Sequence, residues 1–250
     1  MKAHVKEKIK VRAIWISDVH LGSHGCQAKK VLDFMRQYES EYLYLVGDIV
    51  DGWLLSRRWY WPQAHNDVIQ KILRKARKGT KVIFIPGNHD EFARDYCGLW
   101  IGGINVQKEF QHTTADGKLI WITHGDQFDS AIRFGKWLAK LGGSAYDYLI
   151  ILNNVINWFR EKLGLPYWSF AAYVKRNVKN AVKYISNFED VVSQETAAQN
   201  FDGVVCGHIH QACIKQLNGV TYFNCGDWVE TCSALIEYDT GEMALVHYAN

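Results

Sequence analysis

Five short clusters of Asp, His and Asn are spread along this chain of 250 residues. They read D-x-H at residues 18–20, G-D-x-x-D at 47–51, G-N-H-D at 87–90, H-G-D at 124–126 and G-H-x-H at 207–210. Carboxylate, imidazole and amide groups together suit divalent ions such as Mn²⁺, Fe²⁺ or Zn²⁺. Each cluster alone is weak evidence, because most such residues lie in turns, but five in this order predict a metal site.

The number of candidate ligands predicts two ions rather than one. The candidates are Asp18, His20, Asp48, Asn88, His124, His208 and His210. These are too many for one tetrahedral ion, whereas two ions that share a carboxylate need about this number once water and substrate are added. A pair of ions ~3.5–4 Å apart generates hydroxide and stabilises an in-line displacement at phosphorus. We therefore expect a hydrolase that acts at phosphorus.

Each cluster follows an apolar run that we expect to form a strand. The five predicted strands cover residues 11–17, 42–46, 82–85, 118–123 and 202–206. Helical spacing over 27–38 and 66–78 separates the first three strands, which predicts a parallel sheet with right-handed crossovers. Because ligands bind outside the carboxyl ends of strands in open α/β sheets, all five clusters should meet at one rim.

The second half of the chain predicts hairpins and a helical insertion. Asp116-Gly117, Asn218-Gly219 and Thr240-Gly241 supply the positive φ angles of tight turns. They separate strand-like runs at 104–113 and 118–123, at 213–217 and 220–225, and at 234–238 and 243–248. Residues 130–200 show no strand pattern: the run 148–163 is apolar almost all round, and Ser169 is a candidate cap for a helix that reaches Ile185.

The composition excludes several classes of protein. With 48% hydrophobic and 22% charged residues, the chain is neither disordered nor fibrous. A net charge of +3 does not argue for nucleic acid as a partner. The six cysteines form no C-x-x-C pair, which disfavours a zinc knuckle or a redox motif. No signal-like run opens the chain, and its longest apolar run is far shorter than the ~20 residues of a membrane span. We expect a cytoplasmic protein with reduced thiols.

The series of motifs resembles the calcineurin-like metallophosphoesterase superfamily from Ile14 to about His210. The resemblance implies an α/β four-layer sandwich of two mixed sheets flanked by helices, in one domain over residues 1–250. It implies one metal ion held by Asp18, His20, Asp48 and His210. It implies a second ion held by Asp48, Asn88, His124 and His208, so that Asp48 bridges the two.

The non-ligand residues of the G-N-H-D motif are candidates for catalysis. In the mechanism that we expect, Asn88 holds phosphoryl oxygens together with the metals. His89 would be oriented by Asp90 and would stabilise charge or protonate the leaving group. The alternative for the whole chain is a phosphoesterase fold retained as a non-catalytic scaffold, which would be expected to have lost ligands.

The chain length, the short motif spacing and the insertion after H-G-D are similar to the UDP-2,3-diacylglucosamine diphosphatases of bacterial lipid A synthesis. That similarity implies hydrolysis of a nucleotide-linked lipid to UMP and an acylated sugar 1-phosphate. It also implies Mn²⁺ as the preferred ion and peripheral association with the cytoplasmic face of the inner membrane. The well-described members carry Arg at the position of His89, which leaves a phosphodiester, a nucleotide or another lipid phosphate open as substrate.

The insertion is the candidate for recognition of a lipid. Residues 130–186 carry nine Lys or Arg against two acids, together with many aromatic residues. A helical lid over residues 130–200, with an apolar interior and a basic side, suits an amphiphile with an anionic head, and also an anionic membrane surface. The alternative is a helical subdomain with an ordinary core and a solvated basic face. The candidate substrate contacts are Asp129, Arg176, Lys179 and Lys183.

A second aromatic group follows the G-D-x-x-D motif. Trp53, Trp59, Tyr60 and Trp61 are close enough in sequence to the motif to line the mouth of the site. Packing beneath a loop is an equally good explanation for them.

Overall fold

The computed structural model describes residues 8–130, 157–158, 160–164 and 179–248. Its first sheet contains β1 (Ile9–Ile16), β2 (Tyr38–Val46), β3 (Lys81–Ile85), β4 (Trp100–Ile101), β5 (Ile104–Val106), β11 (Ser233–Glu237) and β12 (Met243–His247). Its second sheet contains β6 (Phe110–Thr113), β7 (Leu119–Ile122), β8 (Gly203–Cys206), β9 (Cys213–Leu217) and β10 (Val220–Asn224). The helices are α1 (Ala28–Gln37), α2 (Gly52–Arg57), α3 (Gln63–Arg77) and α6 (Lys179–Ala198), with short 3-10 turns η1 (Glu91–Tyr96) and η2 (Asp126–Ser130).

Both sheets have a parallel centre and antiparallel edges. The strand order is β12–β11–β1–β2–β3–β5–β4 in the first sheet and β6–β7–β8–β10–β9 in the second. The strands β1, β2, β3 and β5 are parallel, as are β7, β8 and β10. The predicted parallel strands and the predicted hairpins are therefore both confirmed. Each sheet contains both kinds of pairing, so the change does not separate one sheet from the other.

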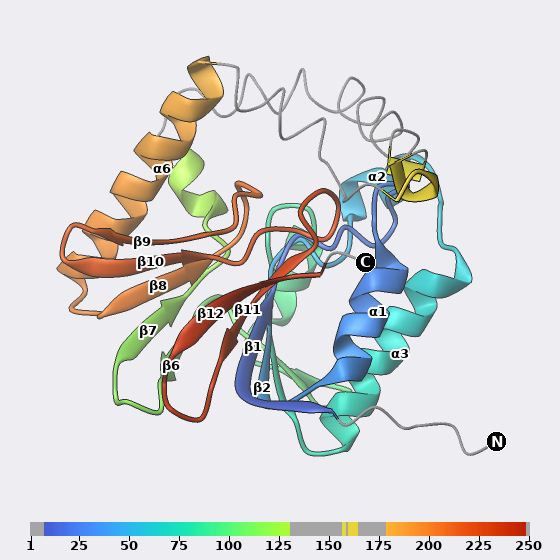
Figure 1. Ribbon diagram of the computed structural model, residues 1–250, viewed down its shortest axis with the longest axis horizontal. Helices are drawn as coiled ribbons and strands as arrows, with labels where there is room; N and C mark the ends of the chain where they lie inside the picture. The colour runs from blue at the N-terminus through green and yellow to red at the C-terminus, as the bar shows by residue number, and fades with distance from the viewer. Residues whose placement is uncertain (1–7, 131–156, 159, 165–178, 249–250) are drawn as a thin grey trace.

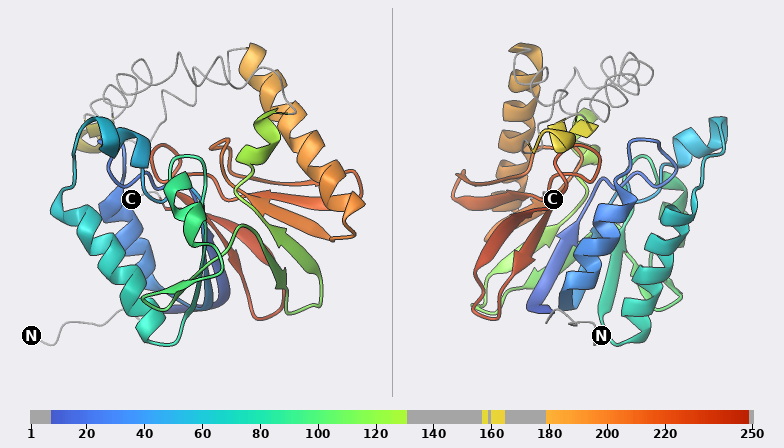
Figure 2. Two further views of the ribbon diagram at one scale, coloured as in Figure 1. Left: turned by 180° about the vertical axis from the view of Figure 1, so that it is seen from behind. Right: turned by 45° about the vertical axis from the view of Figure 1, so that its right-hand side comes forward.

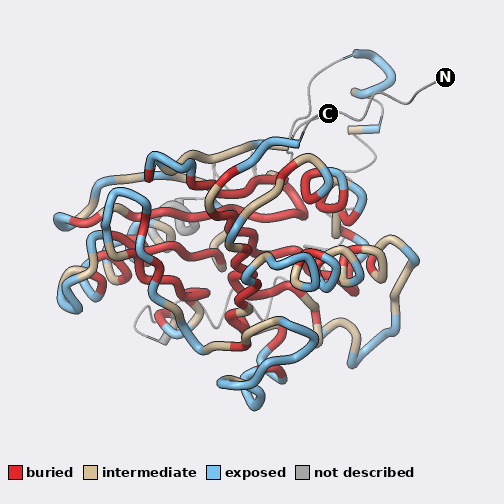
Figure 3. Tube along the Cα trace, turned by 90° about the horizontal axis from the view of Figure 1, so that it is seen from below, coloured by how far each residue is buried: buried red, intermediate tan, exposed pale blue. Residues whose placement is uncertain are grey.

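The two sheets pack face to face, with helices on both outer faces (Figures 1 and 2). Alternation along β1 shows the division: Ala13 and Trp15 face the second sheet, whereas Ile14 and Ile16 face α1 and α3. Helix α6 covers the other side of the second sheet through Phe188. The buried residues run through the interior of both sheets, and the loops and outer helix faces are exposed (Figure 3). The predicted four-layer α/β sandwich is confirmed.

Strand register brings the motif-bearing loops to one edge. Ile16 on β1 lies beside Leu45 on β2, and Val46 on β2 lies beside Ile85 on β3. The three strands therefore end nearly level, and the residues that follow them leave the sheet at the same edge. In the second sheet, Ile122 on β7 lies beside Val205 on β8, so that these two strands also end together.

Two local predictions differ from the structure. The strand predicted over residues 104–113 is two strands, because the chain leaves the first sheet after β5 and enters the second at β6. The polar residues between them, Gln107 to Glu109, make that crossing. Helix α2 was not predicted, since it is only six residues long.

The insertion is described only in part. Most of the apolar run 148–163 lies outside the described residues, as do Ser169 and the chain around it. Helix α6 extends well past Ile185, the predicted end of the helix after Ser169. In the described part of the chain, no helix is both long and apolar enough to span a bilayer.

The contact between the sheets should dominate stability. Trp15 is fully buried and its ring stacks on Tyr44 with centroids 5.3 Å apart. We expect Trp15→Ala to lower the free energy of unfolding by about 3–5 kcal/mol, since truncation of a buried Trp leaves a large cavity. Trp100→Ala is the control, because Trp100 is exposed and its loss should cost within about 0.5 kcal/mol. Urea unfolding measures both; equal costs would contradict this assignment of the core.

Candidate metal centre

The loops after β1, β2, β3, β7 and β8 meet at one edge of the sandwich. They bring together all seven residues predicted as ligands: Asp18, His20, Asp48, Asn88, His124, His208 and His210. Three of these loops leave the first sheet and two leave the second. The centre therefore depends on the alignment of the two sheets.

Five of the seven residues have a left-handed backbone. The φ angles of Asp18, His20, Asp48, His208 and His210 lie between 51° and 66°. This conformation is uncommon for residues other than glycine, and it persists where the surroundings enforce it. Backbone hydrogen bonds supply part of that support: the amide of Asp18 donates to the Gly47 carbonyl and the amide of His20 donates to the Asp48 carbonyl, at 3.0 and 2.9 Å.

The first group of potential ligands is Asp18, His20 and His210. Their nearest nitrogen and oxygen atoms all lie within 4.8 Å of one another. Asp18 Oδ1 is 3.0 Å from His210 Nε2 and 4.0 Å from His20 Nε2. His20 Nε2 is also 4.0 Å from Asp48 Oδ2. This nitrogen thus faces two carboxylates across a gap wide enough for an ion.

The second group is Asp48, His124 and His208, again within 4.8 Å. His124 Nε2 is 3.4 Å from Asp48 Oδ2 and 3.3 Å from Asn88 Oδ1. The same oxygen of Asp48 therefore faces a histidine from each group. Asp48 is placed where a bridging ligand would have to be.

A buried atom without a partner indicates that the first group fits a cation. His20 Nε2 is buried and has no hydrogen-bond partner among the described residues, and it faces the buried Asp18 Oδ1, whose near neighbour is His210 Nε2. A buried polar atom left unsatisfied costs about 1–3 kcal/mol. A divalent ion bound between these atoms would satisfy both, and the nitrogen and oxygen donors suit such an ion.

Hydrogen bonds on the far side of the rings orient the histidines. His20 Nδ1 donates to Asp51 Oδ2 at 3.1 Å, and His124 Nδ1 donates to the Val46 carbonyl at 2.9 Å. Each bond selects the tautomer in which Nε2 is free to bind a metal. In His208 the two ring nitrogens exchange roles. Its Nε2 donates to Asp129 Oδ1 at 2.9 Å, so Nδ1 is the nitrogen left to bind a metal.

The centre stabilises positive charge. Burial alone would raise the pKa of Asp48, but the charges of His124 and His20 outweigh it and hold that pKa well below its usual value. Burial would lower the pKa of His20, yet Asp51 and Asp48 raise it to about 9. Burial likewise opposes protonation of His124, and Asp48 and Asp18 raise its pKa to about 10. Two divalent ions would supply the positive charge that these carboxylates favour.

The expectation that Asp90 orients His89 is wrong. The carboxylate of Asp90 accepts hydrogen bonds from four backbone amides, those of Gly87, Asp48, Ile49 and Val50, at 2.6 to 3.3 Å. Asp90 thus ties the loop after β3 to the loop after β2, and the His89 ring makes its polar contact with Asp51 instead. Burial and the neighbouring Asp48 raise the pKa of Asp90 to about 6.

Asp51 is the carboxylate beside His89. Its Oδ1 is 3.1 Å from His89 Nδ1, while its Oδ2 accepts from His20. One buried residue therefore contacts both a candidate ligand and the candidate acid. The signal was present in the sequence, since Asp51 is the second Asp of G-D-x-x-D, but no role was assigned to it. The backbone amide of His89 donates to Asp48 Oδ1 at 2.8 Å, which leaves Oδ2 for the metals.

The four predicted substrate contacts are only partly placed. Asp129 accepts a hydrogen bond from Tyr184 at 2.6 Å in addition to the one from His208, so it is already engaged. Lys179 and Lys183 belong to the first turns of α6. Arg176 lies outside the described residues. Contact of these residues with substrate stays a prediction.

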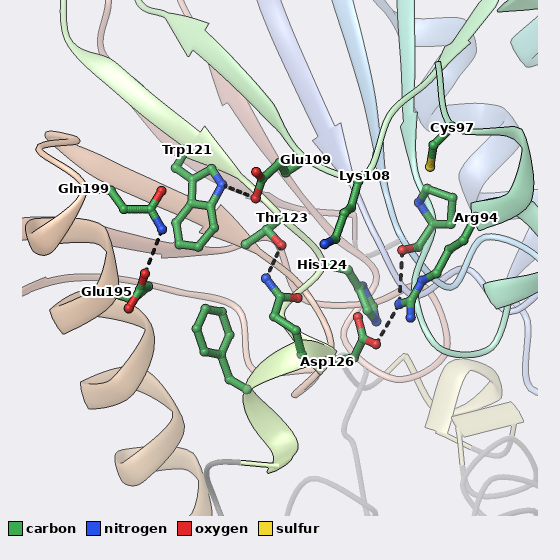
Figure 4. A pocket seen from close by; sticks show the side chains of 13 residues that line it. Arg94, Cys97, Lys108, Glu109, Trp121, Thr123, His124, Asp126, Glu195 and Gln199 are labelled. Carbon is green, nitrogen blue, oxygen red and sulfur yellow. Dashed lines mark hydrogen bonds and ion pairs between the residues drawn. The ribbon is translucent and has the colours of Figure 1, made fainter. Parts of the chain in front are cut away.

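A cavity of about 450 Å³ borders the centre at His124. Trp121 and Phe128 form apolar walls, and Arg94, Lys108 and Asp126 lie on the side nearer to His124 (Figure 4). Arg94 pairs with Asp126 at 2.6 Å. The sequence patterns did not indicate this space, because its walls come from both sheets and from α6.

The chain is similar to several known proteins. A sequence model described as calcineurin-like phosphoesterase matches residues 11–212. A protein of Neisseria meningitidis named UDP-2,3-diacylglucosamine hydrolase is 25% identical over 238 residues, which cover 91% of this chain and 94% of that protein. The protein of the same name from Neisseria gonorrhoeae is 25% identical over 236 residues, covering 90% and 93%. A solved archaeal phosphodiesterase is 13% identical, with a TM-score of 0.45 over 94% of this chain and 98% of that one.

We expect Asp48→Ala to bind fewer than two equivalents of Mn²⁺ and to hydrolyse bis(p-nitrophenyl) phosphate more than about tenfold more slowly, because both ions would lose a shared ligand. Elemental analysis after dialysis measures the metal, and absorbance measures hydrolysis. Asp33→Ala is the control, since that carboxylate is exposed on α1. A variant that keeps both ions and its turnover would refute the bridging role of Asp48.

Variants of His89 and Asp51 should separate catalysis from metal binding. His89→Ala should keep both ions and lower kcat by about 10²–10⁴-fold, as expected for a positioned acid. Asp51→Asn should lower kcat and also weaken metal binding by about 10–100-fold, because it orients His20 as well. Mn²⁺ titration beside steady-state kinetics tests both. Loss of an ion from His89→Ala would make His89 a ligand instead.

Proposed function

The chain belongs to the calcineurin-like phosphoesterase family, and on that premise we propose that it hydrolyses a phosphoanhydride of a nucleotide-linked lipid. It is a metal-dependent phosphoesterase. The proposed substrate is UDP-2,3-diacylglucosamine, with UMP and the acylated sugar 1-phosphate as products. The supporting observation is that relatives named for hydrolysis of this compound match about nine tenths of the chain.

We assign the seven side chains to two ions. The first would be held by Asp18, His20, Asp48 and His210, and the second by Asp48, Asn88, His124 and His208. Mn²⁺ is the proposed ion, because oxygen and imidazole donors without thiolate suit it. When bound, such a pair polarises the phosphoryl group and lowers the pKa of coordinated water.

The residues around the ions would position and protonate the substrate. His89 has Nδ1 against Asp51, so its other ring nitrogen is available to protonate the leaving oxygen. The neighbouring Asp51 carboxylate orients the ring. Asp90 holds the two loops that carry Asp48 and His89 in a fixed relation through its four amide contacts. These residues preorganise the site before substrate binds.

The cavity beside His124 would accept one end of the substrate. Its apolar walls at Trp121 and Phe128 suit a flat apolar moiety. Asp129, Arg176, Lys179 and Lys183 are proposed to contact the remainder, beneath a lid formed by residues 130–200. A lipid substrate also leads us to propose peripheral association with the cytoplasmic face of a membrane.

One observation favours a second candidate. His89, which lies against Asp51, has a second ring nitrogen that can donate a proton to a leaving group, whereas the Arg of well-described diphosphatases keeps its proton. The same centre could therefore serve a phosphodiester or another lipid phosphate that needs a protonated leaving group.

Mass spectrometry of products distinguishes the two candidates. With Mn²⁺ present, the wild type should convert UDP-2,3-diacylglucosamine to UMP and the acylated sugar 1-phosphate, and Asp48→Ala should not. UDP-N-acetylglucosamine, which lacks the two acyl chains, is the matched control and should be hydrolysed far more slowly. Rapid hydrolysis of bis(p-nitrophenyl) phosphate with no turnover of the lipid nucleotide would reject the first candidate in favour of the second.

A further inference from the structure

An exposed group of aromatic and cationic side chains borders the centre. Trp53 is 40% exposed, Trp59 is 74% exposed, and Arg57 and Arg58 between them are exposed as well. In the part of the chain that the structure describes, neither guanidinium has an ion-pair partner. Phe92, 55% exposed, borders the start of α2 at Gly52. We call Trp53, Arg57, Arg58, Trp59 and Phe92 the α2 rim surface.

The packing of its neighbours holds the α2 rim surface in place. Asp51 Oδ1 accepts from the Leu54 amide at 2.9 Å and so caps α2 at its first turn. After the helix, the ring of Tyr60 packs on His24 with centroids 3.7 Å apart, and Trp61 packs edge-on against His65. Tyr60 and Trp61 thus fix the segment, and they leave Trp59 projecting outward. An exposed Trp on a fixed segment contributes little to the core of the protein.

The α2 rim surface is also joined to the catalytic residues. Asp51, which caps α2, contacts His20 and His89. The ring of Trp53 lies 4.3 Å from the ring of His89, and its indole nitrogen donates to Glu91. Figure 1 shows α2 at the same edge of the sandwich as the motif-bearing loops. Whatever contacts the α2 rim surface is therefore held next to the metal centre.

We propose that the α2 rim surface docks the protein on an anionic lipid bilayer, with Trp59 at the level of the headgroups and Arg57 and Arg58 against lipid phosphates. Trp is the side chain that prefers the boundary between water and lipid, and Arg near an anionic bilayer gains electrostatic attraction. This inference rests on the proposed function, which already associates the protein with a membrane, and it adds the surface that would make the contact.

The charge of the α2 rim surface disfavours a second copy of the chain. A two-fold symmetric contact through this patch would set Arg57 and Arg58 against their own copies, which repel. The carboxylate of Glu91 is already engaged by Trp53.

A basic cluster elsewhere is the competing surface. Lys71, Arg74, Lys75 and Lys78 line a cavity of about 320 Å³ beside Glu39 and Ser40, near the beginning of β2. That cluster lies at the opposite end of β2 from Asp48, so docking there would direct the centre away from the bilayer.

Vesicle sedimentation tests the proposal without any hydrolysis. The full chain is mixed with vesicles of phosphatidylcholine, with or without phosphatidylglycerol. The wild type should sediment mainly with the anionic vesicles. Arg57→Gln with Arg58→Gln should weaken that binding by roughly 30-fold, as expected for the loss of two juxtamembrane cations. Trp59→Ala should weaken binding to both compositions by about tenfold, since insertion of an apolar ring is lost.

Matched variants control for exposure and charge. Trp100→Ala removes an equally exposed Trp from the edge strand β4 and should bind as the wild type does. Arg74→Gln with Arg77→Gln removes two cations from the end of α3 and should also bind normally. All variants should hydrolyse bis(p-nitrophenyl) phosphate at the wild-type rate, which shows that the centre is intact.

Three outcomes would overturn the proposal. One is a wild type that fails to bind anionic vesicles. Another is that the Arg74 and Arg77 variant loses vesicle binding while the Arg57 and Arg58 variant binds as the wild type does. That result would move the docking surface to the basic cluster. A third is capture of single-stranded RNA in preference to vesicles, since Trp and Arg also suit that ligand. Failure to hydrolyse a nucleotide-linked lipid, with vesicle binding retained, would affect the proposed function alone.

Discussion

The position of the Asp48 carboxylate is the constraint on which the site depends. It is buried, it follows β2 in a left-handed conformation, and its two oxygens face different groups. Oδ1 accepts from the His89 amide, and Oδ2 faces His20 and His124. A carboxylate is stable in such burial only where positive charge surrounds it, and two histidines and the proposed ions supply that charge. The backbone of His89, the proposed proton donor, is positioned by this same group.

Close approach around Asp48 explains two of the motif glycines. A Cβ on Gly87 would collide with Asp48 Oδ1, and a Cβ on Gly47 would collide with the ring of His124. Gly47 also has a positive φ of 74°. Glycine is needed at both positions because these loops pass closer to their neighbours than a side chain allows.

The alignment of the sheets rests on a buried polar chain as well as on apolar contact. Tyr44 on β2 hydrogen-bonds His112 on β6 at 2.8 Å, and His112 bonds Glu237 on β11 at 2.8 Å. Since both sheets contribute, this chain fixes their relative position, which apolar packing alone specifies less sharply. His124 adds a second link between the sheets, from the loop after β7 to the Val46 carbonyl on β2. The metal ligands of the second sheet reach Asp48 because of these contacts.

The sequence by itself determined which residues follow the strands, which dipeptides turn the hairpins, and therefore the α/β class and the meeting of the five motifs at one edge. These features depend on local periodicity and on the backbone preferences of Gly, Asn and Asp, which a single chain displays directly. The tertiary structure alone decided that residues 104–113 divide between two sheets, that Asp51 rather than Asp90 holds His89, and that a cavity borders His124. Each of these depends on how close two loops or two sheets come in space. Side-chain partners such as Asp51 and His89, 38 residues apart, leave no periodic signal in the sequence.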